Sequence, residues 1–386
     1  MPSSLRRRHF LLASLSSSLA PAHARLRSED IPAAVDRVIR PLMAAHDIPG
    51  MAVGVTSGGT RHLFQYGVAS RESGRPVLPE TLFEIGSLSK TFTATLACQA
   101  QALGKLSLDD SPAVAMPELG GTPIAAATLL HLGTYTAGGL PLQFPDSVKN
   151  LADAVAFYRA WKPRVRPGAQ RRYSNPSIGL MGHASALAMQ GSFTELVERE
   201  LLAPLGLAHT FIDVPASRRD VYAWGYDQAN RPVRVNPGVF DAQAYGVKTT
   251  AADMLRFLEA NLDPAALPAP LRRAVLDTQV ARYRVGPMVQ GLGWEQYPFP
   301  VPLARLQAGN AGTMALEPHA AEPLAARQHA QGPVLFNKTG STNGFGAYAL
   351  FVPARRIGIV LLANRNIPNA ARIEAACALL RQLIPK

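Results

Sequence analysis

The spacing of apolar residues predicts a helix and then a β-hairpin at the start of this 386-residue chain. In residues 31–46 apolar side chains recur every three or four positions, which is typical of an amphipathic helix. Residues 51–56 and 62–68 are rich in strand-forming residues. The glycine-containing segment 57–60 separates them, and such a short polar segment between two strand-like runs favours a hairpin.

The middle of the chain has helical spacing and the end has strand signals. Helices are predicted at residues 125–132, 151–161, 178–189, 194–202 and 249–262. Strands are predicted at 334–337, 346–352 and 357–362, followed by a closing helix at 370–383, and residues 311–333 are predicted to be a long loop. Strands at both ends with helices between them favour one sheet built from both termini.

This order of elements predicts an α/β fold with a helical insertion. The α/β domain is expected to be discontinuous, formed by residues 25–104 and 240–386. Residues 105–239 are expected to form a mainly helical domain, with the active site at the interface. An apolar content of 47% is that of a globular protein.

Charge and cysteine usage narrow the class of protein. The net charge is +12, but the basic residues are mostly Arg spread along the chain, which argues against a nucleic-acid-binding arm. A basic surface can still attract small anions. Cys98 and Cys377 fall in predicted helices and are expected to be buried free thiols, although the sequence leaves a disulfide open.

The first 24 residues have the pattern of an export signal. Three consecutive arginines at 6–8 precede an apolar run at 10–20, and Ala22-His23-Ala24 is typical of a cleavage site. The two arginines before His9-Phe10 are also twin-arginine-like, so either export route fits. The run is too short for a membrane span, so we expect a soluble periplasmic protein without a membrane anchor after cleavage.

Ser87 and Lys90 form the first candidate catalytic pair. A helix is predicted to start near Ser87 and to end near Gly104, which places Lys90 one turn away over the same face. An amine in that position can take the proton of a serine hydroxyl and so activate the oxygen as a nucleophile. The pair alone also fits an ordinary helix start capped by serine.

Two further motifs follow along the chain. Tyr173-Ser174-Asn175 precedes a predicted helix, where serine and asparagine are also common in turns. Lys338-Thr339-Gly340-Ser341 follows a strand-like run, and Gly340 would allow a ligand to approach the backbone closely.

In this order, Ser-x-x-Lys, Tyr-x-Asn and Lys-Thr-Gly together resemble the penicillin-recognising serine hydrolases. Tyr-Ser-Asn in place of Ser-Asp-Asn resembles class C, AmpC-type β-lactamases. Residues 131–143, 241–248, 291–295 and 363–372 are similar to further stretches of that class, whereas residues 311–333 match it poorly.

The resemblance implies a serine β-lactamase fold and a reaction in which Ser87 is acylated by a β-lactam, which water then releases. Lys90 and Tyr173 would handle protons, with the resting base left open between them, and Lys338 would complete the catalytic set. The backbone N–H groups of Ser87 and Ser341 would form an oxyanion hole. The residues implied to bind substrate are Gln143, Asn175, Tyr245, Thr339, Ser341, Asn369 and Arg372.

Other classes of activity lack their motifs. The chain has no Gly-x-Ser-x-Gly, His-Glu-x-x-His or Cys-x-x-Cys, so neither an α/β-hydrolase nor a metalloenzyme is indicated. We expect no cofactor, no nucleic-acid partner and a monomer acting on small molecules. Two alternatives stay open. One is a D-alanyl-D-alanine peptidase or esterase with the same nucleophile, and the other is a non-enzymatic sensor that penicillin acylates and that does not deacylate.

Overall fold

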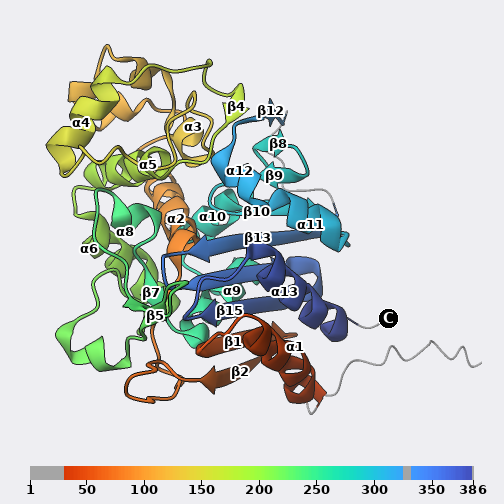
Figure 1. Cartoon of the computed structure of the whole chain (residues 1–386). Coiled ribbons are helices and arrows are strands. Elements are labelled where there is room, and N and C mark those ends of the chain that lie inside the picture. Colours follow the sequence, from red (N-terminus) through yellow and green to blue (C-terminus); the bar gives the residue numbers. More distant parts are fainter. Residues whose placement is uncertain (1–29, 325–331, 385–386) are drawn as a thin grey trace, which may run out of the picture.

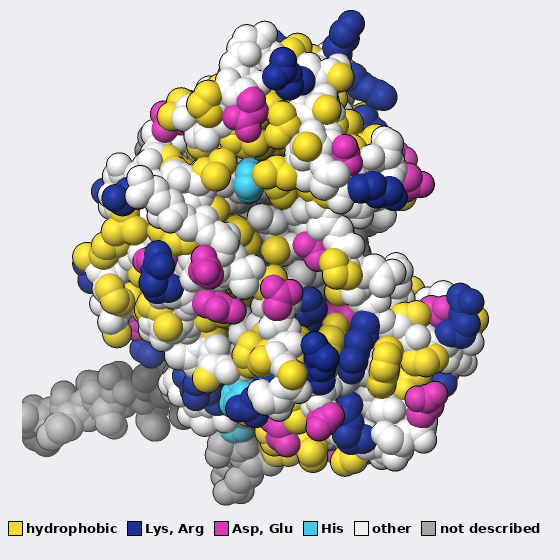
Figure 2. Space-filling model, turned by 90° about the vertical axis from the view of Figure 1, so that its left-hand side faces the viewer, with side chains coloured by type: hydrophobic (Ala, Val, Ile, Leu, Met, Phe, Trp, Pro, Cys, Tyr) yellow, Lys and Arg dark blue, Asp and Glu magenta, His cyan; other side chains and the backbone are white. Residues whose placement is uncertain are grey.

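The computed structural model describes residues 30–324 and 332–384 (Figure 1). The predicted export signal lies outside these residues. No helix in the described ranges combines the length and apolarity that a membrane crossing requires. Basic, acidic and hydrophobic side chains are interspersed on the face drawn in Figure 2, so the positive charge is not gathered into one stripe there.

The centre of the fold is an antiparallel sheet with strand order β12-β8-β9-β10-β13-β14-β15-β1-β2. Its strands are β1 (Gly50–Ser57), β2 (Thr60–Gly67), β8 (Tyr283–Val285), β9 (Met288–Gln290), β10 (Glu295–Pro298), β12 (Glu322–Pro323), β13 (Val334–Ser341), β14 (Gly346–Val352) and β15 (Ile357–Ala363). The N-terminal strand β1 pairs with the C-terminal strand β15, with Met51 opposite Ala363. The predicted α/β fold with one sheet built from both termini is therefore confirmed.

Helices cover both faces of this sheet (Figure 1). One layer contains α1 (Ile31–Ala45), α11 (Leu303–Gly309) and α13 (Asn369–Leu383); the other contains α2 (Ser89–Ala102), α9 (Ala251–Leu262) and α10 (Ala269–Thr278). Because side chains alternate along a strand, Leu361 packs into the core under α1, α11 and α13. Its neighbours Val360 and Leu362 pack into the core under α2, α9 and α10. Every residue of β14 and β15 is buried, which explains their continuous apolar sequences.

The segment between α2 and α9 consists of short helices joined by long loops. It contains α3 (Leu129–Gly133), α4 (Leu151–Ala160), α5 (Asn175–Ala188), α6 (Phe193–Val197), a π-helical turn (Glu198–Leu202), α7 (Ala203–Leu205) and α8 (Asp241–Ala244). A third apolar core lies under α3, α4, α5 and α8 and includes Ala94 and Ala97 from α2, whereas α6 and the π-helical turn pack into the same core as α9. The helix α2 is thus shared between the sheet layers and the helical segment, while the division into two domains stays a prediction.

Two predicted elements differ from the structure. The helix expected at residues 125–132 is broken, because the Thr128 side chain accepts a hydrogen bond from the His131 N–H and caps a new helix, α3. The long loop expected at residues 311–333 is wrong in its described part, which contains α12 (Gly312–Leu316), β11 (His319–Ala320) and β12. The strand β11 pairs with β4 (Gln170–Arg171), a partner too distant in sequence for local patterns to indicate.

Asn364 offers a test of how the sheet is joined to the loops around it. Its buried side chain accepts a hydrogen bond from the Gly50 N–H at 2.7 Å and donates to the carbonyls of Val68 and Trp224. We expect Asn364→Leu to lower the free energy of unfolding by about 2–4 kcal/mol, since these backbone groups stay buried without a partner. Urea denaturation measures the loss.

The matched control for this substitution is Gln228→Ala, which removes an exposed side chain that donates to the Asn366 carbonyl. It should change stability by less than about 0.5 kcal/mol. Equal denaturation midpoints for the two variants would contradict the proposed role of Asn364.

Candidate active site

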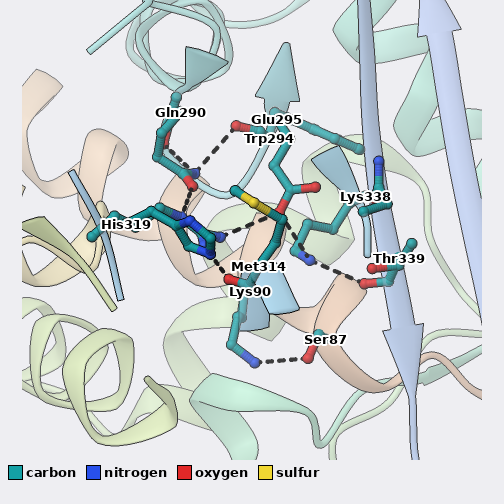
Figure 3. Close-up of polar contacts among 12 residues, drawn as sticks. Ser87, Lys90, Gln290, Trp294, Glu295, Met314, His319, Lys338 and Thr339 are labelled. Atoms are coloured by element: carbon teal, nitrogen blue, oxygen red, sulfur yellow. Dashed lines mark hydrogen bonds and ion pairs between the residues drawn. The ribbon is translucent and has the colours of Figure 1, made fainter. Parts of the chain in front are cut away.

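Ser87 lies in a short 3₁₀ turn (Gly86–Leu88) that leads directly into α2. This turn places Lys90 three residues later on the first turn of the helix. The Lys90 ammonium is fully buried, and it donates to Ser87 Oγ at 3.0 Å and to the Ala244 carbonyl at 2.6 Å (Figure 3). The hydroxyl and the amine predicted from the Ser-x-x-Lys motif are therefore in direct contact.

The end of β13 lies against this turn at a distance that only glycine permits. A Cβ on Gly340 would lie 1.9 Å from the Ile85 carbonyl oxygen, and a Cβ on Gly86, where φ is +50°, would lie 2.5 Å from the Ser341 nitrogen. The backbones that carry the Ser87 and Ser341 N–H groups are thus in contact. Two N–H donors held side by side could stabilise a negatively charged oxygen formed at Ser87.

Tyr173 lies in the turn between β4 and α5. Ser174 caps α5 by accepting a hydrogen bond from the Ser177 N–H at 3.0 Å, so its hydroxyl serves the helix. The Tyr173 hydroxyl is buried and has no hydrogen-bond partner within the described ranges. The ammonium groups of Lys90 and Lys338 lie 5.1 and 5.3 Å from the centre of its ring.

These buried charges bring two pKa values close to neutrality. Burial by itself raises the pKa of Tyr173, but the positive charges of Lys338 and Lys90 outweigh it and lower the pKa to about 8. Burial, together with the positive charge of Lys338, lowers the pKa of Lys90 to about 8 as well. Two neighbouring groups with similar pKa values can exchange a proton readily, which is what a general acid–base pair requires.

Two cavities meet at Ser87. One, of about 410 Å³, is lined by Ser87, Gln143, Tyr173, Asn175 and Tyr245 among others; Asn175 Oδ1 is buried there and has no partner within residues 30–324 and 332–384. The other, of about 170 Å³, is lined on its strand side by Lys338 to Ser341 and also by Asn369. The structure thus brings the predicted substrate-binding residues together on the two sides of the serine, with one exception.

Arg372 is the exception. Its guanidinium is buried behind β13 and donates to the carbonyls of Gly340 and Ala347, to Ser341 Oγ at 2.9 Å and to Asn369 Oδ1 at 2.6 Å. This geometry holds the end of β13 in place and leaves Arg372 away from either cavity. Its contacts with Ser341 and Asn369 connect Arg372 to two residues of the site, while a direct contact with substrate stays a prediction.

Sequence reasoning gave no role to three residues that border the smaller cavity. Arg171 and Glu295 are buried and form an ion pair at 3.6 Å, and Met314 lies on α12 in the segment predicted to be a loop. The strand pairing of β10 with β13, which sets Glu295 opposite Asn337, was the signal that could have located Glu295 beside Lys338. No such signal existed for Met314.

In the part of the chain that the structure describes, no group of three or more His, Cys, Asp or Glu side chains could hold a metal ion. Cys98 and Cys377 are buried free thiols. The site instead offers a serine hydroxyl bonded to an amine, a tyrosine with a lowered pKa and a pair of adjacent backbone N–H groups. These are the components of covalent acyl-transfer catalysis by serine.

Comparison with known proteins finds relatives that match most of the chain. A sequence model described as Beta-lactamase matches residues 35–383. A protein of Pseudomonas fluorescens named beta-lactamase is 50% identical over 351 residues, which cover 91% of this chain and 98% of the relative.

Solved structures agree with this. A beta-lactamase/D-alanine carboxypeptidase from Pseudomonas syringae superposes with a TM-score of 0.89 at 44% identity, covering 91% of this chain and 98% of its own. A class C beta-lactamase in complex with cefoxitin superposes with a TM-score of 0.88 at 42% identity, covering 92% and 99%.

The close approach of β13 to Ser87 can be tested with Gly340→Ala. The added methyl group would meet backbone atoms that cannot rotate away, so the strand must shift and move the Ser341 N–H. We expect the rate at which a fluorophosphonate labels Ser87 to fall by about 10²–10³-fold, the usual cost of losing one oxyanion donor. Intact-mass spectrometry measures the labelling.

Gly312→Ala is the control, since a Cβ at Gly312 meets no atom within 4 Å. This variant should label at the wild-type rate. Labelling of Gly340→Ala at that same rate would show that the contact between the two segments does not matter for the reactivity of Ser87.

Proposed function

The chain belongs to the beta-lactamase family and is a class C β-lactamase-like hydrolase, and from that premise we propose a cephalosporinase acting through Ser87. The observation that carries the proposal is the 3.0 Å contact between Lys90 Nζ and Ser87 Oγ beside a tyrosine of lowered pKa. The substrate would be a β-lactam, and its hydrolysis by an exported enzyme would confer resistance on the cell.

Acylation starts with attack of Ser87 Oγ on the lactam carbonyl. The hydroxyl proton passes to the Lys90–Tyr173 pair and from there to the lactam nitrogen as the C–N bond breaks. At pH 7 a group with a pKa near 8 is about one-tenth deprotonated, whereas an ordinary tyrosine with a pKa near 10 is about one-thousandth deprotonated. The surrounding lysines therefore increase the share of the active base about a hundredfold.

The tetrahedral intermediate places negative charge on the former carbonyl oxygen. The N–H groups of Ser87 and Ser341 would bind this oxygen, and their positions are fixed before the reaction by the contact between β13 and the 3₁₀ turn. Water then attacks the ester, and we assign its activation to Tyr173. Addition of that water releases the opened product and returns the proton to Ser87.

The two cavities would hold the two ends of the substrate. Gln143, Asn175 and Tyr245 line the larger one, where amide groups can bind the acylamino side chain. Lys338, Thr339 and Asn369 line the smaller one, where cationic and polar donors suit the substrate carboxylate. We infer that no metal or other cofactor takes part and that the enzyme acts as a monomer.

A second activity is favoured by one specific observation. The similar Pseudomonas syringae structure bears the double name beta-lactamase/D-alanine carboxypeptidase. A D-alanyl-D-alanine terminus also presents an amide and a free carboxylate, so the same nucleophile and cavities could accept it. A carboxypeptidase activity is therefore the alternative that must be measured beside β-lactam hydrolysis.

Ser87→Ala and Tyr173→Phe test the mechanism together. We expect Ser87→Ala to reduce nitrocefin and cephalothin hydrolysis to background, because it removes the atom that becomes acylated. Tyr173→Phe keeps the ring but loses the proton carrier, so turnover should fall by about 10²–10⁴-fold. A D-Ala-D-Ala peptide assayed in parallel shows which substrate the wild-type enzyme prefers.

Two outcomes of these assays would count against the proposal. A Tyr173→Phe enzyme with wild-type turnover would move the base assignment to Lys90. Release of D-alanine with no measurable nitrocefin hydrolysis by the wild type would replace the lactamase with the carboxypeptidase.

We also propose that the protein acts in the periplasm after removal of residues 1–24, by the Sec or Tat route. The support is the arginine-rich start, the apolar run and Ala22-His23-Ala24. We expect periplasmic protein to begin at or near Arg25, as measured by intact mass. Active protein that retains Met1 would contradict this proposal.

A further inference from the structure

Arg171 is a buried cation next to the site that the mechanism above does not use. Its side chain is 1% exposed. The guanidinium donates to Gln290 Oε1 at 2.8 Å and to the Met314 carbonyl at 2.6 Å, and it forms an ion pair with Glu295 at 3.6 Å. Figure 3 shows Gln290, Glu295 and Met314 gathered on the side of the site away from Ser87.

Arg171 also lies beside the catalytic tyrosine. Its Cζ is 5.4 Å from the centre of the Tyr173 ring and 5.3 Å from that of Tyr135. These distances are within the range at which a cation and an aromatic face attract. The guanidinium is thus held between two tyrosine rings and a carboxylate, with little freedom to move.

Glu295 is shared between Arg171 and Lys338. The same oxygen, Oε1, lies 3.6 Å from the Arg171 guanidinium and 3.6 Å from the Lys338 ammonium. Both cationic side chains and the carboxylate are at least nine-tenths buried, so water screens their interactions poorly. A carboxylate with Lys338 as its single partner would cancel the charge that Lys338 exerts on Tyr173.

We propose that Arg171 is a positioning residue that neutralises Glu295 and so leaves the charge of Lys338 acting on Tyr173. This inference rests on the proposed function only in that cephalothin hydrolysis is used to assay it. Arg171, Lys338 and Glu295 together carry one net positive charge, which faces the tyrosine. Without Arg171, Lys338 and Glu295 together carry no net charge, so the phenolate form of Tyr173 is stabilised less.

His319 lies opposite Arg171 across the β4–β11 pair and is one further titratable neighbour, whereas the remaining groups that face these residues leave this charge count unchanged. Tyr173 is also faced by Lys90 and Ser87 from α2 and its preceding turn, and by Tyr135 from the loop after α3. Glu295 also interacts with Tyr297 and Tyr348 from β10 and β14. Burial raises the pKa of Tyr135, Tyr297 and Tyr348 well above the usual tyrosine value, so all three are neutral at neutral pH.

Three variants separate charge from structure: Arg171→Met, Glu295→Gln and the double variant. The readout is the acidic limb of kcat/KM against pH with cephalothin, which reports the base in the free enzyme. In Arg171→Met the limb should move to higher pH by about one unit or more, the usual effect of losing a cation at this distance. In Glu295→Gln it should move to lower pH.

The double variant is the decisive case. Removing both Arg171 and Glu295 restores one net positive charge, that of Lys338, so the acidic limb should return to within a few tenths of a pH unit of the wild type. Because removing both partners of a buried ion pair can also restore stability lost on removing one, the free energy of unfolding of each variant is measured by urea denaturation beside its pH profile. If Arg171→Met does not fold, the opposite shift expected for Glu295→Gln still tests the charge count.

The matched control is Arg284→Met/Glu322→Gln. This pair also lies 3.6 Å apart and joins β8 to β12 of the same sheet, but both side chains are exposed. Its pH profile should equal that of the wild type. An unshifted limb in Arg171→Met, or a double variant that keeps the shift of Arg171→Met, would overturn the proposal.

A second readout does not depend on β-lactam turnover. The rate at which a fluorophosphonate labels Ser87, followed by intact mass across the same pH range, should show the same order of shifts. Labelling that follows the charge count in an enzyme that hydrolyses no β-lactam would refute the proposed function and support the role of Arg171. Cephalothin hydrolysis with pH profiles that do not follow the charge count would support the proposed function and refute the role of Arg171.

Discussion

The burial of two ammonium groups around one tyrosine is the interaction on which the rest of this site depends. A buried cation loses the solvation that water provides, which favours its neutral form, and a buried tyrosine likewise resists losing its proton. The phenolate and the ammonium groups stabilise one another, whereas the two ammonium groups repel each other. Burial lowers the pKa of Lys90 to about 8, and the charges of Lys338 and Lys90 lower the pKa of Tyr173 to about 8, so the two groups are matched for proton exchange.

The fold supplies this arrangement by bringing three distant parts of the chain to one place. Lys90 comes from the first turn of α2, Tyr173 from the turn before α5, and Lys338 from β13 in the interior of the sheet. Their common position requires the tight contact at Gly86 and Gly340, where no side chain fits. Arg372 secures the same strand end from behind, so the catalytic contact is held on both sides.

Much of this could be predicted from the sequence, and the limits have physical reasons. The spacing of Ser87 and Lys90 predicted their contact because it depends on one helical turn. The sheet was predictable because β14 and β15 are long and apolar, whereas β8, β9 and β11 are too short to carry a clear pattern, and β11 also depends on the distant β4 for its pairing. Arg171 and Glu295 escaped for the same reason: a buried ion pair between residues more than a hundred positions apart leaves no local pattern.

The ionisation of Tyr173 is the most direct test of this account. Labelling the tyrosines with ¹³C at Cζ and following their resonances with pH would give the pKa of Tyr173, assigned with Tyr173→Phe. The account predicts a transition at about pH 8 in the wild type and a clear rise when Lys338→Met removes one of the two cations. A wild-type Tyr173 that titrates at the ordinary value near 10 or above, or one that is unaffected by Lys338→Met, would contradict it.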